Sequence, residues 1–100
     1  MNNLSTKERS LREFEQIPGV GKSIALDLWN LGIRSTSDLG NRDPERLYEK
    51  QCRLAGKPVD RCLLYVFRCA VYYASHRKHD PKLLLWWNWK DGRRSSRTRR

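Results

Sequence analysis

Acidic residues and long apolar runs are both scarce in this chain. Its 100 residues include 11 Asp and Glu against 21 Lys and Arg, which gives a formal net charge of +10. Five of those charges come from arginines in the last eight residues, so the other five are spread over the preceding 92. The deficit of acidic residues favours a polyanionic partner, most simply a nucleic acid, over an acidic membrane surface or an acidic protein. The alternative is that the charge only aids solubility.

No apolar run approaches the roughly 20 residues that a membrane-spanning helix needs. Residues 1–12 are polar, whereas a secretory leader carries an apolar core. We therefore expect a cytoplasmic protein without a membrane contact. A chain of this length holds one small core, which we place in a single domain over residues 1–92. Residues 93–100 contain only Arg, Ser and Thr, and we expect them to form a disordered tail.

Cysteine is also sparse, and its spacing argues against a metal site. Cys52, Cys62 and Cys69 form no Cys-x-x-Cys pair, which is typical of reduced thiols. Cys62, Cys69 and His76 follow one another at intervals of seven residues. On one helix these would lie ~10 Å apart, whereas zinc ligands lie within ~2.3 Å of the ion. We expect no metal or other cofactor, and we interpret Cys62 and Cys69 as core residues.

Apolar residues recur at helical spacing and no convincing strand pattern occurs, so the predicted fold is an all-α bundle of five or six helices. The expected segments are residues 6–16, 22–31, 36–39, 43–54, 59–75 and a last one that opens at Asp80-Pro81. Ser5 with Glu8 predicts a capping box, and Asp43-Pro44 predicts a second helix start. Gly32 is placed to end a helix in the left-handed conformation. In segment 43–54 we expect Leu47, Cys52 and Leu54 to face inward. Residues 59–75 are the most apolar and should form the central helix.

The residues Ile-Pro-Gly-Val-Gly-Lys-Ser at 17–23 are the most informative motif. Gly19 and Gly21 can adopt the positive φ angles of a tight turn and carry no side chain that would keep a phosphate from the backbone. The first N–H groups of the next helix would face out of the turn, where the helix dipole and Lys22 favour an anion. The predicted phosphate-contact residues are Gly19, Val20, Gly21, Lys22 and Ser23.

Apolar stripes flank this motif at helical spacing. They consist of Leu11, Phe14 and Ile17 before the turn and of Ile24, Leu28 and Leu31 after it. Gly21 and Ala25 would let the two helices approach closely. The pattern resembles the helix-hairpin-helix motif, which holds DNA by its backbone. The alternative is a plain glycine turn that binds nothing.

A second, degenerate hairpin is one interpretation of residues 55–59. The flanking helices would then pair with the first two through the short segment 36–39, as in a tandem helix-hairpin-helix domain. This loop lacks a second glycine, although Lys57 and Arg61 could supply charge in place of backbone N–H groups. The alternative is a Gly-Pro loop that serves only as a turn.

Trp86, Trp87 and Trp89 cannot share one face of a helix. We therefore expect them to close a small core, with at least one exposed or wrapped over it. The functional alternatives are stacking on an unpaired base and docking on a protein partner.

Several strings together resemble one small bacterial family, labelled "pathogenicity locus", within the helix-hairpin-helix group. They are Ile17-Pro-Gly-Val-Gly-Lys-Ser23, Asp43-Pro-Glu-Arg-Leu-Tyr48, Val59-Asp-Arg-Cys62, Tyr65-Val-Phe-Arg-Cys-Ala-Val-Tyr72, and Asp80-Pro81 with Trp86-Trp-Asn-Trp-Lys90. The resemblance covers about residues 9–91. It implies the fold and DNA as the ligand class, and some members carry a mitomycin-resistance label that fits a DNA-related role. It implies no reaction.

A DNA-repair enzyme of the glycosylase type is a weaker interpretation. In bifunctional glycosylases, which have a similar hairpin, a nucleophilic Lys stands two places after the second glycine, and that position is Ser23 here. Asp60 could act as a catalytic carboxylate, but it also suits a helix N-cap, and the chain has no second domain to close over a flipped base. We predict no catalytic residues. The sequence predicts a module that binds double-stranded DNA without sequence preference; the alternative is a protein-interaction adaptor with a structural hairpin.

Overall fold

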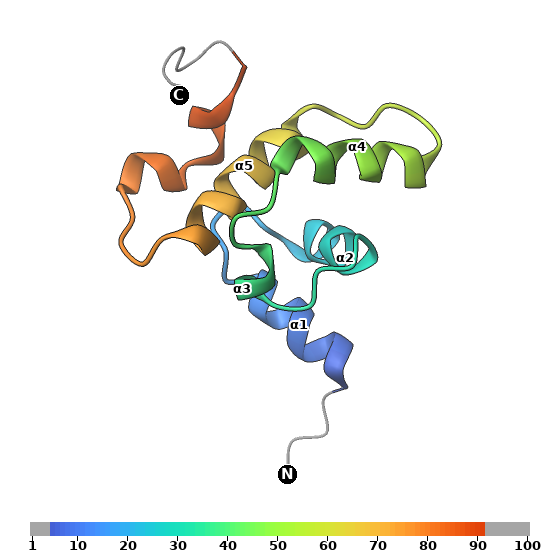
Figure 1. Ribbon diagram of the computed structural model, residues 1–100, viewed down its shortest axis with the longest axis horizontal. Coiled ribbons are helices and arrows are strands. Elements are labelled where there is room, and N and C mark those ends of the chain that lie inside the picture. The colour runs from blue at the N-terminus through green and yellow to red at the C-terminus, as the bar shows by residue number, and fades with distance from the viewer. Residues whose placement is uncertain (1–4, 92–100) are drawn as a thin grey trace.

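Five α-helices and two short 3₁₀-helices make up residues 5–91, the part of the chain that the computed structural model describes (Figure 1). They are α1 (Thr6–Phe14), α2 (Lys22–Asn30), α3 (Thr36–Leu39), α4 (Pro44–Ala55), α5 (Cys62–Ser75), η1 (Pro81–Leu84) and η2 (Trp86–Trp89). No strand occurs between residues 5 and 91, so the all-α prediction is confirmed. The tail expected at 93–100 lies outside the described residues.

The helix starts predicted at Ser5, Asp43 and Asp80 and the helix end predicted at Gly32 are confirmed by their hydrogen bonds and backbone angles, whereas α1 ends two residues before and α5 begins three residues after the predicted bounds. The Glu8 N–H donates to the Ser5 hydroxyl at 3.1 Å, and the Ser5 N–H donates to the Glu8 carboxylate at 2.9 Å. The carboxylates of Asp43 and Asp80 each accept from the N–H two residues further on, at 2.9 and 3.0 Å. Gly32 has a φ of +96° directly after the C-cap of α2. Local capping chemistry therefore sets most of the element boundaries.

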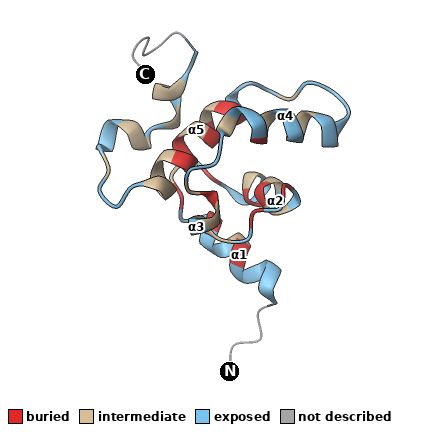
Figure 2. Ribbon diagram, in the orientation of Figure 1, coloured by how far each residue is buried: buried red, intermediate tan, exposed pale blue. Residues whose placement is uncertain are grey.

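Helix α5 is the central element, as its apolar composition predicts. Seven of its 14 residues are buried, and Figure 2 shows buried residues concentrated along it. It packs against α3, α4, η1 and η2. The predicted stripes of α1 and α2 also meet in the core, with Phe14, Ile17, Leu28 and Leu31 buried and Leu11 and Ile24 partly buried.

Two predicted core residues are exposed instead. Leu54 was expected to face inward, but it is 57% exposed because the last turn of α4 extends beyond the start of α5 (Figure 1). Cys62 is exposed in the first turn of α5, whereas Cys69, two turns on, is buried. The interpretation of both cysteines as core residues is therefore wrong for Cys62 and confirmed for Cys69.

The last predicted segment is not one α-helix. It divides into η1 and η2 at Leu85, whose φ of −96° and ψ of 110° are those of extended backbone. A continuous helix would spread three leucines and three tryptophans around all its faces. The break brings Trp86 onto the core and leaves Trp87 exposed.

Candidate functional site

A tight turn over residues 15–21, here called the glycine turn, joins α1 to α2 (Figure 1). Two backbone hydrogen bonds of 3.0 Å hold it: the Ile17 N–H donates to Phe14 O, and the Val20 N–H donates to Ile17 O. Ile17 and Val20 are buried, and Gly19 between them has a φ of +86°. The apolar residues therefore anchor the turn in the core while the glycines stay at the surface.

Gly19 is required by the fold for two reasons. Its φ lies in the left-handed region that glycine adopts without strain. A Cβ placed on it would lie 3.1 Å from Cδ1 of Trp86, which is tighter than ordinary contact. Trp86 therefore packs directly against the turn and supports it from behind.

Gly21 has no such structural reason to be glycine. Its φ of −99° is not left-handed, and a Cβ on it would meet no atom within 4 Å. The predictions of a positive φ and of a role in close helix packing are both wrong for this residue. Ala25, by contrast, is 0% exposed and lies in the core. The Gly21 backbone is instead open to approach from outside.

Helix α2 also begins without a side-chain cap. The other four α-helices of residues 5–91 each have a side-chain oxygen that accepts from a backbone N–H of the first turn: Ser5 at α1, Ser35 at α3, Asp43 at α4 and, one residue before the N-cap Arg61, Asp60 at α5. Among the 3₁₀-helices of this range, η2 also starts without a side-chain cap. At α2 the N-cap is Gly21, which has no side chain to accept a hydrogen bond. The first bond of this helix runs from the Ala25 N–H to Gly21 O at 2.9 Å.

The open N–H groups at this helix start belong to Lys22, Ser23 and Ile24, which donate no hydrogen bond within residues 5–91. The Val20 N–H is already used inside the turn. The Lys22 side chain is 90% exposed, and its ammonium lies 3.7 Å from the Glu15 carboxylate. An exposed pair at this distance is worth about 1 kcal/mol at most, so Lys22 can exchange it for another anion.

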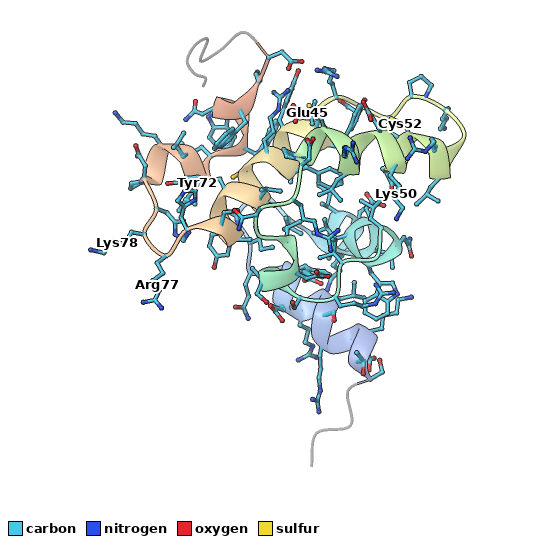
Figure 3. The ribbon with its side chains drawn as sticks, in the orientation of Figure 1. Glu45, Lys50, Cys52, Tyr72, Arg77 and Lys78 are labelled. Atoms are coloured by element: carbon cyan, nitrogen blue, oxygen red, sulfur yellow. The ribbon has the colours of Figure 1, made fainter. Side chains whose placement is uncertain are left out.

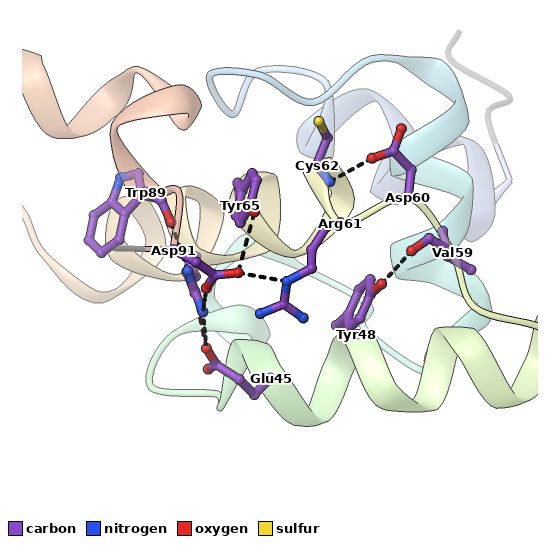
Figure 4. Close-up of polar contacts among 10 residues, drawn as sticks. Glu45, Tyr48, Val59, Asp60, Arg61, Cys62, Tyr65, Trp89 and Asp91 are labelled. Carbon is purple, nitrogen blue, oxygen red and sulfur yellow. Dashed lines mark hydrogen bonds and ion pairs between the residues drawn. The ribbon is translucent and has the colours of Figure 1, made fainter. Parts of the chain in front are cut away.

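The loop between α4 and α5 differs from the glycine turn. Gly56, with a φ of +73°, ends α4, and the Lys57 N–H bonds back to Cys52 O at 3.2 Å. The Lys57 side chain is exposed. The Asp60 carboxylate accepts from the Cys62 N–H at 2.9 Å, so the start of α5 already holds an anionic group (Figure 4). The N-cap of α5 is Arg61 rather than Asp60, which the sequence suggested, but Asp60 still supplies the side-chain oxygen at this helix start.

A charged cluster beside this loop was not predicted. Arg68 donates to Glu45 through Nε and Nη2 at 3.0 and 2.7 Å, and its Nη2 lies 2.9 Å from Asp91. Arg61 binds the other oxygen of Asp91 at 2.6 Å (Figure 4). The hydrogen bond from Arg61, followed by that from Arg68, lowers the pKa of Asp91 to about 2. The sequence signal was Arg68 itself, the one charge after Arg61 in the most apolar segment.

This cluster joins the end of η2 to α4 and α5. A third Arg68 nitrogen donates to Trp89 O at 2.7 Å. Arg61, predicted to contact phosphate, is therefore engaged with Asp91, although half of its side chain remains exposed. Of the two charges predicted at this loop, Lys57 is the one outside the cluster.

The tryptophans divide between core and surface, as predicted. Trp86 packs on the core, and the Trp89 indole N–H donates to Leu83 O at 2.9 Å. Trp87 is 45% exposed. A docking surface that includes the tryptophans would therefore centre on Trp87 and the nearby exposed Leu85.

Between residues 5 and 91 the structure brings no three His, Cys, Asp or Glu side chains together as metal ligands. Burial raises the pKa of the Cys69 thiol to about 11, so this sulfur stays protonated at neutral pH. None of the helices in the same range has the length and apolarity needed to cross a membrane.

A family profile described as "Pathogenicity locus" matches residues 7–95. The chain belongs to the pathogenicity locus family. The chain is similar to the "Mitomycin resistance protein McrB" of Streptomyces lavendulae, with 34% identity over 70 residues. That alignment covers 70% of the chain and 63% of the relative, so the chain matches less than two thirds of the relative's length. No solved structure matches this pathogenicity locus chain.

Proposed function

We propose that this chain binds double-stranded DNA through the sugar–phosphate backbone, without reading base sequence, at the glycine turn. The observation that carries the proposal is the open start of α2. At each of the other four α-helices between residues 5 and 91 a side-chain oxygen accepts from a backbone N–H of the first turn, whereas the glycine at the start of α2 leaves these groups accessible. On this proposal the α1–turn–α2 unit is a helix-hairpin-helix motif.

The chemistry of such a contact follows from three aligned features. The N–H groups of Lys22, Ser23 and Ile24 can donate to phosphate oxygens, and the positive end of the helix dipole favours a negative charge there. The missing side chain at Gly21 lets a phosphate approach the backbone. Lys22 adds a mobile positive charge. None of these groups reads a base edge, so the binding we propose is independent of sequence.

Lys57 and the exposed part of Arg61 are secondary contacts in this proposal. They could add charge to the binding surface, but the capping carboxylate of Asp60 leaves the start of α5 less suited to a phosphate than the start of α2. A chain that binds DNA in this way would act in the cytoplasm of a bacterial cell.

The test is the substitution Gly21→Asp. An aspartate at an N-cap accepts from the first helix N–H groups, so it should leave stability unchanged or raise it by up to about 1 kcal/mol. The same carboxylate occupies the proposed phosphate position and repels the DNA. We expect affinity for a labelled duplex, measured by fluorescence anisotropy, to fall at least about tenfold, equivalent to about 1.4 kcal/mol.

The matched control is Thr6→Asp, which adds the same charge at the exposed start of α1. This variant should bind DNA almost as well as the unmodified chain, because its new charge lies away from the glycine turn. Equal affinities for all three proteins at moderate salt would remove the glycine turn from the binding surface.

Protein docking at Trp87 is the second candidate function. It is favoured by the exposure of Trp87 and Leu85 on neighbouring residues, since aromatic residues concentrate binding energy in interfaces. In that case Trp87→Ala should abolish capture of the partner while Gly21→Asp leaves it intact. A DNA-binding loss confined to Gly21→Asp would instead favour the first proposal.

A further inference from the structure

A second basic surface lies at the opposite end of α2 from the glycine turn. There a groove of about 440 Å³ opens between the end of α2 and one side of α4. Its lining residues are Leu31, Arg42, Asp43, Arg46, Leu47, Glu49, Lys50 and Arg53. Four of these are cations and two are carboxylates, so the α4 groove, as we call it here, carries an excess of positive charge.

The cations of the α4 groove are poorly neutralised by the protein. Arg46 and Arg53 are exposed and form no ion pair within residues 5–91. Lys50 donates to the carbonyl of Leu31 at 3.2 Å, which fixes its ammonium at the end of α2, and Figure 3 shows it on the side of α4 that faces α2. Of the four cations, Arg42 alone has a carboxylate partner among the described residues, Asp38 at 2.9 Å.

The spacing of these cations suits an extended anion rather than a single ion. Arg46, Lys50 and Arg53 follow one another at intervals of four and three residues, so they lie along one side of α4. The row is about 10 Å long, since a helix rises about 1.5 Å per residue. A single phosphate would meet one or two of these side chains, whereas a chain of phosphates can meet all three.

We propose that the α4 groove binds a second segment of nucleic-acid backbone. This inference rests on the proposed function, because it extends the same ligand class to a separate surface. Lys22 and Leu31 lie at opposite ends of α2, about 13 Å apart along its axis. We assign the α4 groove to the backbone of a second duplex, and not to another part of the duplex that is seated on the glycine turn.

The experiment counts duplexes bound per chain. The full chain is titrated with a short duplex of about 10 base pairs, one helical turn, at low salt and at concentrations well above the dissociation constant. The test variant is Arg46→Glu with Arg53→Glu. Its matched control is Arg77→Glu with Lys78→Glu, which makes the same charge change on side chains that point away from the body (Figure 3). Gly21→Asp is measured alongside.

We expect the Arg46/Arg53 variant to bind one duplex fewer than the unmodified chain and the Arg77/Lys78 variant to bind the same number. An unchanged count in the Arg46/Arg53 variant, or an equal loss in the control, would overturn the inference. Gly21→Asp separates the two proposals. If it keeps the full count while the Arg46/Arg53 variant loses one duplex, the glycine turn fails as a site and the α4 groove stands.

Discussion

At the scale of single residues, the two glycines of the turn have different physical roles. The fold requires glycine at position 19, because the backbone there is left-handed and Trp86 packs close to where a Cβ would be. Gly21 has neither a left-handed backbone nor a neighbour within 4 Å of the place where a Cβ would be. Both look alike in the sequence, since a Gly-x-Gly spacing carries no information on φ or on a tryptophan 67 residues away in the chain.

Alanine substitutions should separate these roles in urea denaturation. Gly19→Ala combines left-handed strain with the Trp86 contact and should cost about 2–4 kcal/mol. Gly32 has a φ of +96°, but a Cβ on it would have no close neighbour. Gly32→Ala should therefore lower the free energy of unfolding only by the backbone strain, about 1–2 kcal/mol. Gly21→Ala should change stability by less than about 1 kcal/mol. A Gly21→Ala cost as large as that of Gly19→Ala would contradict this assignment.

At the scale of elements, the helix starts were the most predictable part of the fold. Ser5 with Glu8, Asp43-Pro44 and Asp80-Pro81 act through neighbours within three residues, so the sequence alone contains the whole interaction. The division of the last segment into η1 and η2 was not predictable, because it depends on packing against α5. The exposure of Leu54 depends likewise on where α5 begins.

The charged cluster that joins the end of η2 to α4 and α5 should make stability depend on pH in the acid range. Arg61 and Arg68 hold the pKa of Asp91 at about 2, below its ordinary value of 3.8. A lowered folded-state pKa contributes stability above about pH 3.8, and this contribution is lost as the pH falls towards 2. Because Asp91 is nearly half exposed, we expect it to be worth about 1 kcal/mol or less.

The measurement is unfolding free energy from urea titrations between pH 7 and pH 2, compared with that of Asp91→Asn. The substitution should lower stability at pH 7 and flatten the decline between pH 4 and pH 2. Parallel curves for the two proteins over that range would mean that Asp91 makes no net contribution through its charge.

At the scale of the whole molecule, the sequence predicted the fold class and the family, while the structure was needed to locate the charged side chains on the surface and to show which of them are paired. The net charge of +10 indicated a polyanionic partner but not where it would bind. The motif at residues 17–23 predicted the open start of α2, whereas the α4 groove is a surface that arises only when the helices are placed in space. The counter-charges on Arg61 and Arg68 came from Asp91 and Glu45, which are distant in the sequence.

Salt dependence should report how much of the binding comes from the five arginines at 93–100. Each phosphate neutralised on duplex DNA adds about 0.9 to the slope of log affinity against log salt. A chain that ends at Gly92 should therefore show a slope smaller by up to about 4.5, with residual binding that Gly21→Asp still weakens. Complete loss of binding on truncation alone would assign the DNA contact to the tail.

The most direct test of the central claim is a titration of isotopically labelled protein with duplex DNA, followed by the backbone amide resonances in NMR spectra. Our account predicts that the largest shifts occur at the amides of Lys22, Ser23 and Ile24, with little change at the Trp87 indole. Shifts that leave these three amides unchanged while the complex forms would contradict it.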